Sequence, residues 1–219
     1  MTIERPAIQS FQPPVRTLMG PGPSDVPPRV LSALARPTVG HLDPSFVGMM
    51  DEVKTLLRYA FQTRNDLTFP VSGPGSLGME TCFVNLVTPG DKVIVCVNGV
   101  FGGRMVENVR RLGGTPVIVE DAWGSPVDPA KVEDAFKANP DARLFAFVHA
   151  ETSTGALSDA ATLAAIARRH DALTIMDCVT SLGGVPVLLD EWGIDAAYSG
   201  SQKCLSCTPG LSPVSFSEA

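Results

Sequence analysis

One lysine, Lys203, stands among small and uncharged residues in the segment SGSQKCL. From Cys178 to Ala219 the chain contains only five charged residues, so we expect this amine to be at least partly buried. Burial lowers the pKa of an amine and favours the neutral nucleophile, which can form a Schiff base with a carbonyl compound. A surface loop, where most lysines lie, is the ordinary alternative. The charge-poor neighbourhood favours the reactive interpretation.

A carboxylate, Asp177, follows the apolar run LTIM. At the end of a strand, such a group can bind a metal, act as a base or pair with a cationic ring nitrogen. The common alternative is an aspartate that stabilises a turn or caps a helix. Asp177 alone does not decide between these roles.

Three glycines, Gly73, Gly75 and Gly78, have the spacing G-x-G-x-x-G between a predicted strand and a predicted helix. Glycine allows backbone N–H groups to approach an anion, and the start of a helix attracts negative charge. Dinucleotide binding would also need an acid at the end of the next strand. Asp91 precedes that strand, which ends in Asn98. A phosphate site is therefore favoured, while an NAD-binding oxidoreductase and a plain tight turn remain alternatives.

Cysteine and histidine spacing gives no zinc signature. Cys204 and Cys207 form a single C-x-x-C, and His41, His149 and His170 are scattered along the chain. A structural zinc site would need a second pair of ligands at matching spacing. We therefore predict no metal, reduced thiols, and a His149 that makes a strand-end hydrogen bond rather than acting as a base.

The elements that must position these residues alternate between apolar strands and helices. We expect strands over 66–72, 92–98, 115–120, 143–149, 173–177, 196–201 and 213–217, and helices over 44–61, 79–86, 101–112, 128–136 and 158–170. This order predicts an α/β fold with a mostly parallel sheet and helices on both faces. In such sheets ligands bind beyond the carboxyl ends of the strands. Ser72, Asn98, His149–Thr154, Asp177 and Ser199–Lys203 fall at that edge.

Composition limits the class of protein. The chain has 219 residues, 44% of them hydrophobic and 18% charged, and its net charge of −6 comes without any run of Lys or Arg. These features argue against a disordered chain and against a nucleic-acid or anionic-membrane surface. No apolar stretch approaches the roughly 20 residues of a spanning helix, and the first residues lack the apolar core of a signal peptide. Five cysteines, an odd number, indicate reduced thiols and a cytoplasmic location.

Two regions are expected. Residues 1–43 form a Pro- and Gly-rich segment in which closely spaced prolines are expected to exclude regular helix or sheet. Residues 44–219 carry the alternating pattern and form the large ligand-binding domain.

Taken together, several segments resemble the class V pyridoxal-phosphate aminotransferases, in particular the alanine–glyoxylate and serine–pyruvate group. The matching pieces are GPGPSDVP, FQTRNDLT, SGPGS, the PGD of Pro89–Asp91, NGVFGGR, HAETSTG, MDCVTSLGG, YSGSQK and PG-x-S. They occur in family order from about Leu18 to Phe216. The resemblance implies the large domain of the type I pyridoxal-phosphate transferase fold.

The resemblance also implies pyridoxal 5'-phosphate as the cofactor and a role for each matched residue. Lys203 would hold the cofactor as an internal aldimine and later move the proton between the substrate Cα and the cofactor C4′. Asp177 would pair with the pyridine nitrogen and keep it protonated, which strengthens the ring as an electron sink. The other contacts would come from Gly75 and Ser76 at the phosphate, Gln202 beside it, Phe101 and Val179 on the two ring faces, and Thr152 at the ring substituents.

Two positions depart from the family pattern, and a third bears on the branch of the family. Pro74 stands where relatives often have serine, so one phosphate contact is expected to be lost, and Phe101 stands where they often have tryptophan, so ring stacking is expected to be modestly weaker. Cysteine desulfurases usually have histidine directly before the lysine. Gln202 in that position favours the aminotransferase branch.

The implied reaction is transamination of a small amino acid, alanine or serine, to glyoxylate or pyruvate, by a homodimer when the enzyme is intact. Members of the family are nearly twice as long and grip the substrate carboxylate with an arginine of a small C-terminal domain. The sequence is therefore expected to be the N-terminal and cofactor-binding portion, truncated after the lysine region. The alternatives are a fragment that binds the cofactor or a partner without turnover, and the NAD-binding oxidoreductase.

Overall fold

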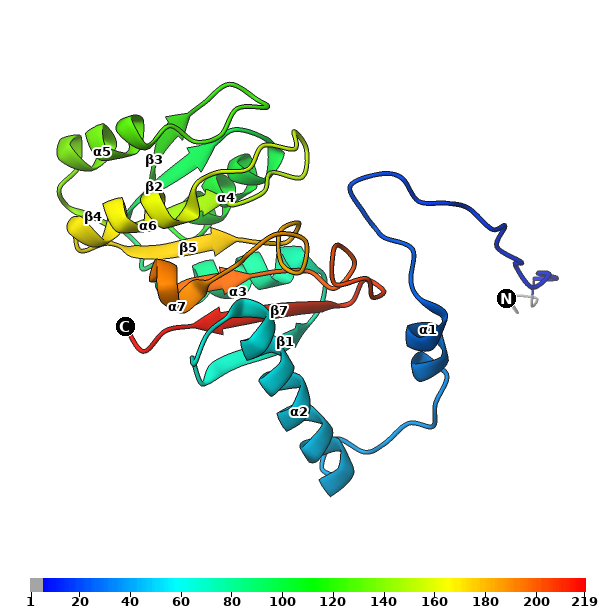
Figure 1. Ribbon diagram of the computed structural model, residues 1–219. Helices are drawn as coiled ribbons and strands as arrows, with labels where there is room; N and C mark the ends of the chain where they lie inside the picture. The colour runs from blue at the N-terminus through cyan, green and yellow to red at the C-terminus, as the bar shows by residue number, and fades with distance from the viewer. Residues whose placement is uncertain (1–5) are drawn as a thin grey trace, which may run out of the picture.

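Seven strands form one sheet in the computed structural model, which describes residues 6–219 (Figure 1). They are β1 (Leu67–Ser72), β2 (Lys92–Val97), β3 (Thr115–Glu120), β4 (Ala142–Val148), β5 (Leu173–Asp177), β6 (Ala196–Tyr198) and β7 (Leu211–Phe216). The order across the sheet is β1-β7-β6-β5-β4-β2-β3. β7 pairs antiparallel with both of its neighbours, whereas the strands from β6 to β3 pair in parallel. The predicted α/β fold with a mostly parallel sheet is confirmed.

Helices cover both faces of this sheet, as expected. The helices are α1 (Pro28–Leu34), α2 (Pro44–Phe61), α3 (Gly75–Leu86), α4 (Val100–Arg111), α5 (Pro129–Ala138), α6 (Ala160–Arg169) and α7 (Leu189–Trp192). α3 and α4 pack together on one face, and α5, α6 and α7 pack on the other (Figure 1). Within residues 6–219, none of these helices is long and apolar enough to cross a lipid bilayer.

The two faces have separate apolar cores because side chains alternate along each strand. In β2, Val93 and Val95 face the core under α3 and α4, whereas Ile94 and Cys96 face the core under α5, α6 and α7. All four are at most 1% exposed. A strand buried on both faces explains the continuous apolar run in this segment.

Helices α5 and α6 each begin directly after an aspartate that caps them. The start of α6 differs by a residue or two from the predicted one. Asp128 caps α5 as expected, and its side chain accepts a hydrogen bond from the N–H of Ala130. For α6 the cap is Asp159, which accepts from the N–H of Thr162 at 3.1 Å. The expectation that Ser158 begins this helix was wrong, because its hydroxyl is buried and accepts from the N–H of Val127.

The expectation for the proline-rich segment was wrong over seven residues, since α1 spans Pro28–Leu34. Pro28 occupies the first position of this helix. Proline lacks an N–H but needs none in a first turn, and its fixed φ suits a helix start. The division at residue 43 stays a prediction, although Asp43 caps α2 there by accepting from the N–H of Ser45.

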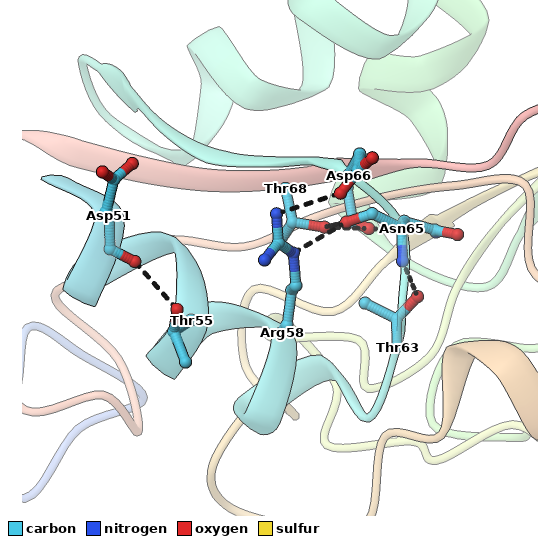
Figure 2. Close-up of polar contacts among 8 residues, drawn as sticks. Asp51, Thr55, Arg58, Thr63, Asn65, Asp66 and Thr68 are labelled. Atoms are coloured by element: carbon cyan, nitrogen blue, oxygen red, sulfur yellow. Dashed lines mark hydrogen bonds and ion pairs between the residues drawn. The ribbon is translucent and has the colours of Figure 1, made fainter.

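A polar turn joins α2 to β1 (Figure 2). The Arg58 guanidinium donates to the carbonyl of Asn65 at 3.2 Å and to Asp66 Oδ1 at 3.3 Å. The N–H of Asn65 donates to Thr63 Oγ1, and the Thr68 hydroxyl donates to the carbonyl of Asn65. These contacts fix the start of β1, the strand that leads into the glycine segment.

Candidate functional site

A cavity of about 140 Å³ lies at the carboxyl edge of the sheet, where the segments after β1, β2, β5 and β6 meet. Seven of the predicted site residues line it: Gly75, Ser76, Phe101, Asp177, Val179, Gln202 and Lys203. Pro74, Met79, Arg104 and Tyr198 complete the lining. The fold thus brings together residues that are far apart in the sequence.

A larger hollow of about 680 Å³ lies by the amino ends of β5 and β6, near Leu173 and Asp195. None of the predicted site residues lines it. The smaller cavity is therefore the one that carries the candidate chemistry.

The first turn of α3 forms one wall of the small cavity. Its N-cap, Pro74, offers no side-chain cap, so the first N–H groups of this 12-residue helix can serve an anion. A Cβ on Gly75 would lie 3.2 Å from Val179 Cγ2, and one on Gly78 would overlap Ser212 on β7. These two glycines let the helix start sit close to the sheet. At the end of β2, Asn98 presents an amide where ribose binding would need an acid.

Asp177 is a buried carboxyl group at the end of β5, only 2% exposed. Its Oδ1 accepts a hydrogen bond from the N–H of Val179, and its Oδ2 accepts one from the Tyr198 hydroxyl, both at 2.8 Å. Burial raises the pKa of Asp177 to about 7, the charge of Glu151 adds to the rise, and the two hydrogen bonds oppose it. This side chain can therefore gain or lose a proton near neutral pH.

Lys203 is half-buried, and desolvation lowers the pKa of its amine, with the charge of Asp177 acting in the opposite direction. The expected partial burial is confirmed. Its Nζ donates to the carbonyl oxygen of Pro21 at 2.9 Å. This contact joins residues that are far apart in the chain, and it was not predicted from the sequence.

Pro21 belongs to a strap, which we define as residues 20–25, that crosses the lysine segment. Ser24 anchors the strap, because its N–H and its hydroxyl both donate to the carbonyl of Gln202, at 2.9 and 3.0 Å. Gly22 has a φ of 120°, and a Cβ there would lie 2.8 Å from Lys203 Nζ. The strap therefore closes over the amine at a position that has room only for glycine.

Phe101 lies in the first turn of α4, and the guanidinium carbon of Arg104 is 4.7 Å from the centre of its ring. Thr152 does not line the cavity. Its hydroxyl lies 2.9 Å from that of Thr180, which itself donates to the carbonyl of Ala150. The role expected of Thr152 therefore stays a prediction.

Tyr198 was missed from the sequence, although it hydrogen-bonds the central carboxyl group. It pairs directly with Asp177 in the parallel register of β5 and β6. Only knowledge that these two strands are neighbours would have identified it.

His149 makes the strand-end hydrogen bond that was predicted, since its Nδ1 lies 3.0 Å from Ser181 Oγ. Burial lowers the pKa of His149 to about 4. Within residues 6–219, no three His, Cys, Asp or Glu side chains are grouped to bind a metal ion, and all five cysteines are free thiols.

These two buried groups have opposite effects on the pH dependence of folding. The native state holds a proton on Asp177 that the unfolded chain has lost, so its contribution to stability falls as the pH rises from 3.8 to about 7. His149 is neutral in the native state and binds a proton on unfolding, so its contribution rises from about pH 4 to 6.5. Over the shared range the two effects partly cancel.

We therefore expect the stability of Asp177→Asn to show the pH dependence that comes from His149 alone. Without added ligand, the free energy of unfolding of Asp177→Asn, relative to the unsubstituted chain, should rise from pH 4 to 6.5. The gain is about 1.4 kcal/mol per pH unit for one proton. Urea unfolding at a series of pH values measures it. Parallel pH profiles for the two proteins would contradict the pKa of about 7 for Asp177.

Comparisons with known proteins place this arrangement among known folds and sequences. A family model described as "Aminotransferase class-V" matches residues 18–219. The (S)-ureidoglycine–glyoxylate transaminase of Bacillus subtilis is 39% identical over 206 residues, which are 94% of this chain and 49% of that protein. The alanine–glyoxylate aminotransferase of Drosophila melanogaster is 41% identical over 206 residues, which are 94% of this chain and 52% of that protein.

A crystal structure of alanine–glyoxylate aminotransferase from Nostoc sp. matches with a TM-score of 0.94 and 44% identity, over 97% of this chain and 56% of that one. The chain spans about half the length of the curated relatives it matches. The fold and the sequence thus agree on one family.

Proposed function

Because the chain belongs to the class-V aminotransferase family, we propose that it binds pyridoxal 5'-phosphate in the Lys203 cavity for transamination. The donor we propose is a small amino acid, alanine or serine, and the acceptor is glyoxylate or pyruvate. One observation carries the proposal: a half-buried amine and a buried carboxyl group, Lys203 and Asp177, line one cavity with an uncapped helix start. Glyoxylate appears in the names of the relatives quoted above, which supports this choice of acceptor.

The cavity residues fit this cofactor. The buried Oε1 of Gln202 has no hydrogen-bond partner among the described residues, 6–219. Rotating the amide by half a turn would present its NH₂ group in that place, where a phosphate would accept from it. The first turn of α3, with Gly75 and Ser76, offers N–H groups to the same anion. Phe101 and Val179 provide apolar walls for an aromatic ring.

The cofactor, when bound, supplies a ring that withdraws electrons from the substrate Cα. Asp177 would keep the proton on the ring nitrogen, since a cationic partner stabilises an ionised carboxylate in this buried place. Its two donors, Val179 and Tyr198, keep the carboxylate oriented. Lys203 would hold the cofactor through Nζ, and its free amine would move the proton at the substrate Cα. Desolvation lowers the pKa of this amine and so favours its neutral form, which is the form that can accept a proton.

We propose further that residues 44–219 form the cofactor-binding domain and that the working enzyme is a cytoplasmic homodimer. Five free thiols support a reducing compartment. The partners are small amino acids and 2-oxo acids.

Isotope exchange tests the proposed function. With pyridoxal phosphate in deuterated water, we expect the chain to exchange the Cα proton of alanine, and to form pyruvate when glyoxylate is added. NMR measures both. Cofactor binding without exchange would favour the fragment that binds without turnover, and tight NAD binding without pyridoxal phosphate would favour an oxidoreductase.

The strap gives a further prediction. A methyl group at Gly22 meets the Lys203 side chain and requires a φ of 120°, whereas one at Gly20 meets no atom within 4 Å. Strain of this kind costs about 1–3 kcal/mol. Because this strain destabilises the closed strap over the amine, we expect Gly22→Ala to speed cofactor uptake about tenfold, measured as the rise of bound-cofactor absorbance. Gly20→Ala is the matched control, and equal rates for the two variants would contradict the role of the strap.

A further inference from the structure

Glu151 is a buried carboxylate in the loop after β4, and it is only 1% exposed. It does not line the cavity. Its Oε2 accepts from the N–H of Phe101 at 3.2 Å, and its Oε1 accepts from the N–H and the hydroxyl of Ser153 at 3.1 and 2.8 Å. These partners are all neutral donors. Burying a carboxylate without a cationic partner is costly, and these hydrogen bonds offset part of that cost.

The neighbouring residue Gly99 leaves space for this carboxylate. Its φ is 174°, extended backbone that any residue adopts, so its conformation does not require glycine. A Cβ there would lie 2.5 Å from Glu151 Cδ and 2.7 Å from Ser153 Oγ. The glycine is therefore explained by the close approach of Glu151 to the chain.

Together, Glu151 and Ser153 cap α4 from a distant part of the sequence. The N–H of Val100 donates to Ser153 Oγ at 3.0 Å, and that of Phe101 donates to Glu151. The N-cap of this helix, Gly99, has no side chain that could serve these groups. A negative charge at a helix start is also favourable to the helix dipole. The cap fixes the backbone that carries the Phe101 ring into the cavity.

We propose that Glu151 is a positioning residue that holds the Phe101 ring against the bound cofactor by capping α4 from the loop after β4. This inference rests on the proposed function, because it takes Phe101 as the residue that packs on the cofactor ring. Glu151 acts on the cofactor through the position of Phe101.

A double-mutant cycle separates positioning from plain stability. Glu151→Gln keeps the size of the side chain but turns an NH₂ group toward N–H or hydroxyl donors. We expect it to weaken pyridoxal-phosphate binding about tenfold, the typical effect of a lost cap or charged hydrogen bond. The visible circular dichroism of the bound cofactor should fall with it. Phe101→Leu removes the ring and leaves the cap in place.

In the Phe101→Leu background, we expect Glu151→Gln to lower cofactor affinity much less, because no ring remains to be positioned and only the loss of the Glu151 charge near Asp177 is left. An equal loss in both backgrounds, or an unchanged affinity and dichroism, would overturn the inference. Failure of the unsubstituted chain to bind pyridoxal phosphate would instead contradict the proposed function.

Gly99→Ala provides a second variant in case Glu151→Gln does not fold. Its methyl group displaces the Glu151 carboxylate, whereas a methyl group at Gly103 on the same helix meets no atom within 4 Å. We expect Gly99→Ala to lower the cofactor dichroism and Gly103→Ala to leave it unchanged. Thermal unfolding without cofactor shows whether each protein is folded. A folded Gly99→Ala with unchanged dichroism would also overturn the inference.

Discussion

Replacing Lys203 by alanine is expected to abolish covalent retention of pyridoxal phosphate and to lower the rate of Cα proton exchange by about 10²–10⁴-fold. The amine is the only part of this side chain that can bond to an aldehyde and move a proton. Fold stability should change little, since within residues 6–219 Nζ makes one hydrogen bond, to the carbonyl of Pro21. To measure retention, the protein is mixed with cofactor and separated from the free cofactor by gel filtration. The cofactor absorbance of the protein peak then gives the amount retained.

Lys137→Ala is the matched control. Lys137 is an exposed lysine on α5 that pairs with the neighbouring carboxylates of Glu133 and Asp134. Such surface pairs contribute little to stability. We expect this variant to retain cofactor like the unsubstituted chain. If Lys203→Ala retained as much cofactor as Lys137→Ala, the assignment of Lys203 would be wrong.

Asp177→Asn is expected to lower the exchange rate by roughly two to three orders of magnitude, because breaking a buried charge pair costs about 3–5 kcal/mol. The amide oxygen can still accept from the N–H of Val179, and the Tyr198 hydroxyl can turn to accept from the new NH₂ group. The fold should therefore survive while the charge opposite the ring nitrogen is lost. Covalent retention of the cofactor by Lys203 should persist, so this variant separates the loss of exchange rate from a loss of cofactor binding.

Tyr198→Phe is the control for Asp177→Asn. It removes one hydrogen bond to the carboxylate and keeps the charge, so we expect a rate loss of about tenfold. Exchange of the alanine Cα proton measures both variants. A rate for Asp177→Asn equal to that of Tyr198→Phe would show that the charge of Asp177 has no special role.

The sequence predicted most of the fold because buried strands have a strong local signal. The apolar runs that became β2 and β4 lie inside the sheet, each with a strand on both sides, and the residues that end the parallel strands meet at one edge. The order of the strands and the reversed direction of β7 depend on contacts between distant segments, which local patterns do not encode. The short helix α1 was missed because Pro28 was read as a helix breaker, whereas it begins the helix.

For the site, local signals and family resemblance identified Lys203, Asp177 and the glycine segment, which the fold brings into one cavity. They did not identify Tyr198, Glu151 or Pro21. Tyr198 depends on strand register, and the other two on contacts across the fold: Glu151 with Phe101, and Pro21 with Lys203.

Lys203 is the residue that we propose binds pyridoxal phosphate. This assignment can be tested by borohydride reduction of the chain with a small excess of cofactor, followed by peptide mass mapping. We expect one cofactor-sized mass addition per chain, on the peptide that contains Lys203 and on no other lysine in comparable yield. An addition spread over surface lysines, or one that persists unchanged in Lys203→Ala, would contradict it.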